Sequence, residues 1–187
     1  MINDLLDISK MEEGSMNLER HELTAAAVVD QALQQVASLA AQQKLTLARE
    51  LAPDLPRFWA DEDKLRRMLV NLLGNAIKFT PVGGTVTISV RADDEENTLL
   101  FAVRDTGEGI PPEAFERIFE KFGQVENRKA GRKMSTGLGL TFCKLAAEAH
   151  GGRIWLESRL GQGSTFSFTI PMRFATIAPE TDLLPEK

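Results

Sequence analysis

The sequence predicts one α/β domain between a short helical segment and a polar tail. Stretches in which apolar residues recur at helical spacing alternate with short runs of alternating polar and apolar residues, which are typical of half-buried strands. A length of 187 residues is enough for one domain with a sizeable core. Hydrophobic residues make up 43% of the chain and charged residues 26%, as is usual for soluble globular proteins.

Four segments are predicted to be helical. Residues 1–13 carry an apolar stripe and form the last turns of a helix. Thr24 is a suitable N-cap for a second helix over about residues 25–43. Helical spacing of apolar residues continues over residues 69–78 and again over residues 142–149.

Short alternating runs predict the strands of a sheet. They lie at residues 45–50, 85–91, 98–104, 153–158 and 165–170. The acidic turn 93–97 separates the second and third of these runs and therefore predicts a hairpin. Pro171 and the polar, proline-bearing residues after it predict a tail or linker.

The third helix carries amides and an ammonium group on one face. Asn71, Asn75 and Lys78 stand at i, i+4 and i+7, so their side chains point the same way, while leucines, alanine and isoleucine cover the opposite face. An amide oxygen suits Mg²⁺, and a lysine can meet a phosphate as a point charge. The alternative is that these are three solvated polar residues on a surface helix.

Two glycine-bearing segments follow. Asp105 ends a buried strand and is followed by Gly107 and Gly109, which let the backbone bend close to a ligand. The carboxylate can accept a hydrogen bond from the exocyclic amine of a base. This segment is also a plausible tight turn. Residues 135–140 (STGLGL) open the fourth helix, where free backbone N–H groups can face phosphate oxygens. Neither segment is a Walker A loop or a dinucleotide fingerprint.

Five segments occur in the order of the motifs of a known family. The sequence resembles the ATP-binding catalytic domain of sensor histidine kinases, within the superfamily that also contains gyrase, Hsp90 and MutL. Its asparagine box, first glycine box, phenylalanine box and two later glycine boxes are matched by residues 71–80, 105–111, 119–122, 135–140 and 161–166. Upstream, the resemblance reaches residues 61–67.

The resemblance implies a fold and a division of the chain. The fold is an α/β two-layer sandwich (α+β) with a mixed sheet of about five strands, three helices on one face, and a mobile ATP lid between Phe122 and Gly137. Residues 1–14 would be the end of the second helix of a dimerisation hairpin. Residues 15–171 would form the catalytic domain, and residues 172–187 a tail or linker.

The resemblance also implies ATP and Mg²⁺ as cofactors. Asn75 would hold the metal and bind ATP, Asn71 and Lys78 would act beside the triphosphate as catalytic residues, and Asp105 would read adenine. The other residues implied to bind the nucleotide are Phe79, Gly107, Gly109, Ile110, Phe122, Lys133, Ser135, Thr136, Gly137, Leu138, Gly139, Leu140 and Thr165.

The lid segment is basic. Residues 126–133 carry four basic residues and one acidic residue, so a triphosphate would order this weakly anchored loop. The alternative is a solvated loop whose charges only aid solubility. The family often has a further glycine where Ser135 stands, which puts the kinetics of the lid in doubt.

Phosphoryl transfer fits these residues better than hydrolysis. ATPases of the superfamily generally have a glutamate where this chain has Asn71, and an amide cannot act as a general base. Transfer needs mainly positioning and charge neutralisation. The alternatives are a nucleotide-binding module without activity in isolation and a gyrase- or Hsp90-type ATPase.

The phosphoacceptor histidine is expected outside this chain. His21 begins a sequence like the family's acceptor motif, but the arginine and proline are missing and it follows the predicted hairpin, so a surface strand or loop is expected there. His150 is expected to close a helix. The implied partners are the dimerisation hairpin of the same kinase and the receiver domain of a response regulator.

Composition excludes several other classes. A net charge of −5 argues against nucleic acid as the main partner. No apolar run approaches the roughly 20 residues of a membrane span, and the N-terminus lacks the basic start of a signal peptide. Cys143, the one cysteine, is expected to be a buried structural thiol. We therefore expect a cytoplasmic domain.

Overall fold

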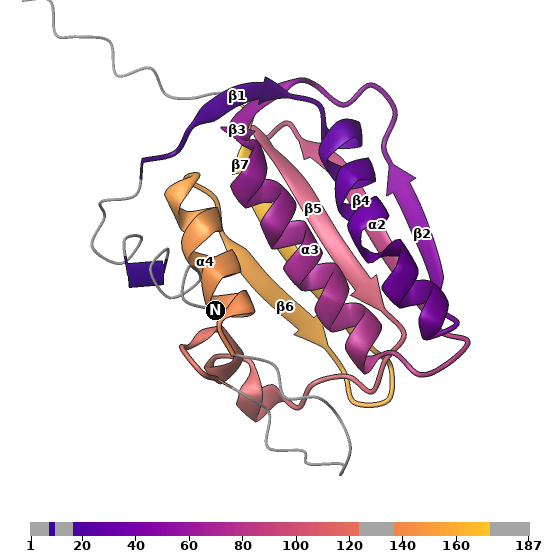
Figure 1. Cartoon of the computed structure of the whole chain (residues 1–187). Coiled ribbons are helices and arrows are strands. Elements are labelled where there is room, and N and C mark those ends of the chain that lie inside the picture. The colour runs from indigo at the N-terminus through magenta and orange to yellow at the C-terminus, as the bar shows by residue number, and fades with distance from the viewer. Residues whose placement is uncertain (1–7, 10–16, 124–136, 173–187) are drawn as a thin grey trace, which may run out of the picture.

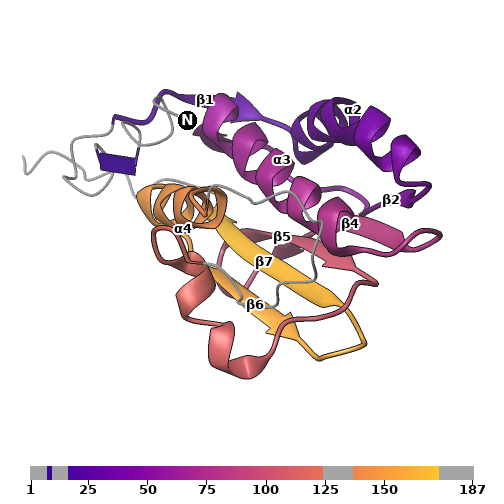
Figure 2. The same cartoon turned by 60° about the horizontal axis from the view of Figure 1, so that its bottom comes forward.

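A mixed five-stranded sheet with three helices on one face forms the centre of the structure. The structure is a computed structural model that describes residues 8–9, 17–123 and 137–172. The strand order in the sheet is β2-β4-β5-β7-β6. Figure 1 looks onto the helices α2, α3 and α4, and Figure 2 shows them as one layer above the sheet. The predicted two-layer α/β sandwich is confirmed.

The five predicted strands are all present, with bounds close to those expected. They are β2 (Thr46–Leu51), β4 (Thr85–Asp93), β5 (Thr98–Asp105), β6 (Ile154–Ser158) and β7 (Ser164–Pro171). Only β2 and β4 pair in parallel, and the other neighbours are antiparallel. The predicted hairpin is the β4–β5 pair.

The helices α2 and α3 begin where short polar side chains cap them. In α2 (Ala25–Gln42) the hydroxyl of Thr24 accepts a hydrogen bond from the Ala27 N–H, as predicted. The carboxylate of Asp61 does the same for Lys64 at the start of α3 (Glu62–Phe79). The third helix of the layer is α4 (Gly139–Ala149), and two short 3₁₀ helices, η1 (Pro112–Ala114) and η2 (Arg117–Phe119), precede it.

Alternation along the strands separates an apolar face under the helices from a polar face. On the covered face, the rings of Phe101 in β5 and Phe168 in β7 stack with centroids 5.0 Å apart, and Phe58 lies 6.0 Å from Phe101. All three rings are fully buried. Their neighbours Ala102 and Ser167 pair with each other on the uncovered face.

A second, two-stranded sheet was not predicted. Strand β1 (Arg20–Leu23) pairs antiparallel with β3 (Phe58–Asp61), which runs directly into α3. Four-residue strands carry too little alternation to be recognised in the sequence. His21 is exposed in β1, in agreement with the expected surface strand.

Several predictions concern residues outside the described ranges. Of the predicted N-terminal helix, only Ile8 and Ser9 are described; both are helical, and Ile8 is fully buried in the core cluster. The lid segment 124–136 and the tail 173–187 are not described. Within the described ranges, no helix is both long and apolar enough to cross a bilayer.

The stacked rings give a test of the helix-covered core. We expect Phe168→Ala to lower the free energy of unfolding by about 3–5 kcal/mol, because it removes a fully buried ring that stacks on Phe101. Ser167→Ala, at the next residue but on the uncovered face, is the control and should cost less than about 1 kcal/mol. Urea unfolding followed by circular dichroism measures both. Similar losses for the two variants would contradict this division of the faces.

Candidate functional site

Two glycine segments pack against α3, and the site lies where they meet it. At Gly107, a Cβ atom would stand 2.6 Å from the carbonyl oxygen of Phe79, the last residue of α3, and 2.6 Å from Oδ1 of Asp105. The missing side chain therefore lets the turn after β5 touch the helix end. At Gly139, a Cβ atom would lie 3.5 Å from Cγ of Asn71. Three of the sequence motifs thus converge on one helix.

The polar face of α3 looks away from the core, as predicted. Asn71, Asn75 and Lys78 are all half-buried. The helix buries a complete apolar face against the sheet and α2, consisting of Leu65, Met68, Leu69, Leu72, Leu73, Ala76 and Ile77. This face fixes the rotation of the helix, so the two amides and the ammonium group must point to the side where the glycine segments lie.

The amides of α3 differ in their hydrogen bonds. Nδ2 of Asn71 donates to the carbonyl oxygen of Gly139 over 3.5 Å, which links α3 to the first residue of α4. The side chain of Asn75 makes no hydrogen bond within the described part of the chain. Lys78 Nζ lies 5.1 Å from the centroid of the exposed Phe79 ring. Asn75 can therefore offer its amide oxygen to a cation.

Asp105 presents one carboxylate oxygen to the site. Its side chain is only 5% exposed, and Oδ1 accepts hydrogen bonds from the N–H groups of Gly107 (2.8 Å) and Ser164 (3.3 Å). Burial raises the pKa of Asp105, and these two bonds oppose the rise. No described residue donates to Oδ2. A ligand amine can fill that vacancy, so the residues present fit an adenine base.

The turn after β6 holds the Asp105 segment in place. The Ile110 N–H donates to Oγ of Ser158 over 2.8 Å, and the Gly161 N–H donates to the carbonyl oxygen of Glu108 over 2.8 Å. The hydroxyl of Ser158 in turn donates to the carbonyl oxygen of Gly163 over 2.9 Å. These bonds join the predicted first and last glycine segments into one unit.

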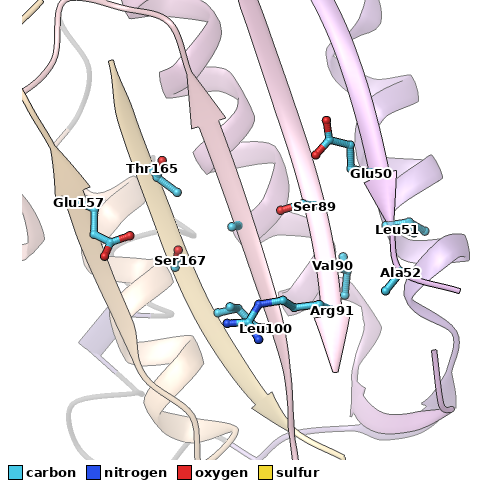
Figure 3. Close-up of a pocket in the computed structure, with 11 residues that line it drawn as sticks. Glu50, Leu51, Ala52, Ser89, Val90, Arg91, Leu100, Glu157, Thr165 and Ser167 are labelled. Atoms are coloured by element: carbon cyan, nitrogen blue, oxygen red, sulfur yellow. The ribbon is translucent and has the colours of Figure 1, made fainter. Parts of the chain in front are cut away.

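Thr165 does not join the other predicted site residues. In the sheet it pairs with Arg104 and Glu157, and it lines a depression of about 640 Å³ on the uncovered face. Figure 3 shows it there beside Glu157, on the side of the sheet away from the helices. Its neighbour Ser164, which was not predicted, contacts Asp105 instead. The alternation of Thr165 with Phe166 could have revealed this, because β7 must bury the phenylalanine.

The start of α4 has the backbone arrangement of an anion site. Among the described residues no side chain caps this helix, and Leu138 at its N-cap position is buried. Its first N–H groups can therefore face an anion. Gly137 has φ +69°, and its carbonyl oxygen accepts a hydrogen bond from the N–H of Phe122, whose ring is 63% exposed. This bond joins two described residues, one on each side of residues 124–136.

The remaining predicted residues divide between described and undescribed positions. Lys133, Ser135 and Thr136 lie outside the described ranges, so their roles stay predictions. Leu140 is half-buried in the first turn of α4. Cys143 is fully buried, and burial raises the pKa of its thiol to about 12, in agreement with the structural role expected for it.

The side chains around α3 suit a metal held jointly with a phosphate ligand. Residues 8–9, 17–123 and 137–172 contain no group of three or more His, Cys, Asp or Glu that could hold a metal ion. Mg²⁺ needs no such group, because it is usually bound through one or two protein oxygens together with substrate phosphates and water. Among the described residues, Asn75 offers such an oxygen through its side-chain amide.

Comparison with known proteins agrees with this arrangement. The family described as histidine kinase-, DNA gyrase B-, and HSP90-like ATPases matches residues 60–173. The chain is 37% identical over 172 residues to the adaptive-response sensory kinase SasA of Rippkaea orientalis, and this match covers 92% of the chain but 43% of that kinase.

Solved structures show the same fold. Full-length ShkA in complex with AMPPNP is similar with a TM-score of 0.82 and 32% identity, over 93% of this chain and 35% of that one. The catalytic domain of the histidine kinase ThkA is similar with a TM-score of 0.70 and 27% identity, over 83% of this chain and 97% of that one. The predicted resemblance is confirmed, and the chain belongs to the family of histidine kinase-, DNA gyrase B-, and HSP90-like ATPases.

Proposed function

We propose that this chain is the catalytic part of a sensor histidine kinase that binds Mg²⁺ and ATP and transfers the γ-phosphoryl group to a histidine of a dimerisation hairpin. The phosphoryl group would then pass to an aspartate of a response regulator. The observation that carries this proposal is the convergence of both glycine segments on α3, at Phe79 and Asn71. The relatives support it, since SasA and ThkA are named as kinases.

The base would be read at the end of β5. Oδ2 of Asp105 would accept a hydrogen bond from the exocyclic amine of adenine, while Oδ1 stays bonded to Gly107 and Ser164. GTP carries a carbonyl at the corresponding position, and two acceptors repel each other. Burial raises the pKa of Asp105, and an amine that donates to Oδ2 would stabilise the charged form of the carboxylate.

The triphosphate would lie between α3 and the start of α4. Asn71 is bonded to Gly139, the first residue of α4, and backbone N–H groups in the first turn of that helix would donate to phosphate oxygens. Lys78 stands two turns further along the same face of α3. Mg²⁺ held by Asn75 would neutralise part of the charge on the phosphates.

Transfer is favoured over hydrolysis because the described residues of the site offer no base for water. On the face of α3 that looks toward the glycine segments, the polar groups are the amides of Asn71 and Asn75 and the ammonium group of Lys78, and none of them acts as a general base. Glu108 is exposed, and its backbone carbonyl is bonded to Gly161. An imidazole acceptor needs no such base, since its unprotonated nitrogen is itself a nucleophile.

The acceptor imidazole would come from another segment or chain. His150 is buried. His21 lies in β1, which pairs with β3 just before α3 begins, whereas the site lies toward the other end of α3. The partners would be the hairpin and a receiver domain. Because ATP is an intracellular substrate, the site would work in the cytoplasm.

Asn75→Ala tests the metal ligand. We expect it to weaken binding of ATP in the presence of Mg²⁺ by about tenfold or more, because the amide acts at the phosphate end. Binding of adenosine should stay within about twofold of the wild type, and EDTA should remove most of the difference between the two proteins. Isothermal titration calorimetry measures both ligands. Gln34→Ala, an exposed amide on α2, is the matched control. Equal losses for both ligands would exclude this role.

Asp105→Asn tests base recognition. An asparagine can donate as well as accept, so we expect weaker ATP binding and a smaller preference for ATP over GTP, by about tenfold. Competition of ATP and GTP against a fluorescent nucleotide gives the ratio. Asp94→Asn, at an exposed position between β4 and β5, should leave the ratio unchanged. An unaltered ratio in Asp105→Asn would remove that residue from base reading.

Labelling with radioactive ATP tests the reaction itself. The chain should bind ATP, hydrolyse it slowly, and label a separately supplied dimerisation hairpin with phosphate that is acid-labile and base-stable, as phosphohistidine is. The chain should not label itself, and His21→Ala should change nothing. Strong self-labelling that His21→Ala abolishes would show that this chain carries its own acceptor.

A further inference from the structure

A buried polar cluster lies at the opposite end of α3 from the site. His150, which follows α4, is only 3% exposed, and its Nε2 accepts a hydrogen bond from the N–H of Asp61 over 3.1 Å. Because Nε2 accepts, the proton lies on Nδ1, which donates to the carbonyl oxygen of Ala146 over 2.7 Å. Burial, above all, lowers the pKa of His150, so the imidazole is neutral at neutral pH.

Asp61 caps α3 and also binds the backbone of Glu19, just before β1. Its Oδ1 accepts the N–H of Lys64, and its Oδ2 accepts both the N–H of Glu19 (3.0 Å) and the ammonium group of Lys64 (2.7 Å). Burial alone would raise the pKa of Asp61, but the hydrogen bonds from Lys64 and Glu19 outweigh it and lower that pKa. The carboxylate is therefore charged, and both of its oxygens accept hydrogen bonds.

Arg20 fastens the same segment to α4. Its guanidinium Nη2 donates to the carbonyl oxygen of Ala149, the last residue of α4, over 3.0 Å. A positive charge is favourable at this end of a helix. Figure 1 shows β1 at the end of the helix layer where α3 begins and α4 ends. We call Glu19, Arg20, Asp61 and His150 the junction clasp.

The two helices held by the clasp are also joined along their length. The guanidinium carbon of Arg67 in α3 lies 3.9 Å from the centroid of the Phe142 ring in α4. The thiol of Cys143 donates to the carbonyl oxygen of Met68 over 3.6 Å. With the bond from Asn71 to Gly139, these contacts make α3 and α4 a single body that runs from the clasp to the site.

We propose that the junction clasp fixes the angle at which the chain upstream of Glu19 meets α3 and α4, and thereby orients the site toward the acceptor hairpin. This inference rests on the proposed function. With 18 residues, α3 is about 27 Å long. A tilt of about 10° at the clasp would move its far end by about 5 Å, whereas a misplacement of about 1 Å can cost a hundredfold in rate. Four residues far from the chemistry thus act as positioning residues.

Ile8 supports this role for the clasp. It lies upstream of the clasp, in the helical pair of residues 8 and 9, and it is fully buried in the core cluster of the domain. An apolar contact and a polar clasp therefore hold the upstream chain at two places. Two attachments fix an angle, which a single flexible connection would not.

The test compares a hairpin joined upstream of residue 1 with the same hairpin supplied as a separate protein. We expect Arg20→Met, which keeps the apolar stem, and His150→Phe, which removes the acceptor for Asp61, to lower phosphohistidine formation about tenfold in the joined protein. With the separate hairpin, both rates should stay within about twofold of the wild type, as should ATP affinity. His150→Gln keeps an acceptor and should restore the joined rate. His21→Ala, one residue further along β1 and exposed, is the matched control.

Each other outcome has its own meaning. Equal losses with joined and separate hairpins, or weaker ATP binding, would overturn the proposal, because the clasp would then only stabilise the domain. An unchanged joined rate would also overturn it. If the wild type forms no phosphohistidine in either arrangement, the proposed function fails. Hydrogen exchange at the Glu19 amide then still tests the clasp. The clasp requires that this amide exchange faster in Arg20→Met than in the wild type, and at the wild-type rate in His21→Ala.

Discussion

The rotation of α3 about its axis is the constraint on which the rest of the structure depends. Successive residues of a helix differ in direction by about 100°, so a shift of one residue would turn Asn71 and Asn75 into the core. Burying an amide without a partner costs about 1–3 kcal/mol, while the same shift would expose leucines that are now fully buried. The apolar face therefore decides where the polar face points, and the site inherits its geometry from the core.

Close backbone contacts then bring the other parts of the site to that helix. The turn after β5 can lie against the end of α3 because Gly107 has no side chain, and Asp105 can bond to the start of β7 because Gly163 has none. These approaches leave little room for adjustment, so Asp105, Ser164 and α3 must move together. Such a rigid frame suits a site whose chemistry consists mostly of positioning.

The features that could be predicted from the sequence are those encoded within one element. The polar face of α3, the cap at Thr24 and the β4–β5 hairpin each depend on neighbours a few residues away. The role of Ser164 could also have been predicted, because successive residues of β7 point to opposite faces of the sheet and Ser164 therefore faces away from Thr165. The junction clasp was not, because Asp61 meets Glu19 across 42 positions and His150 across 89. No local sequence pattern indicates which distant backbone N–H group will donate a hydrogen bond to a buried imidazole.

The clasp also shows why a polar junction suits this place better than an apolar one. Apolar side chains can slide and repack at little cost, whereas the N–H groups of Glu19 and Asp61 each have one acceptor at a set distance. Leaving the buried N–H of Asp61 unpaired would be expensive. A network that is satisfied in only one arrangement selects that arrangement, even where it adds little net stability. Under the proposed function, in which the site meets an acceptor on another segment, a single defined angle at the junction matters more than the strength with which the junction is held.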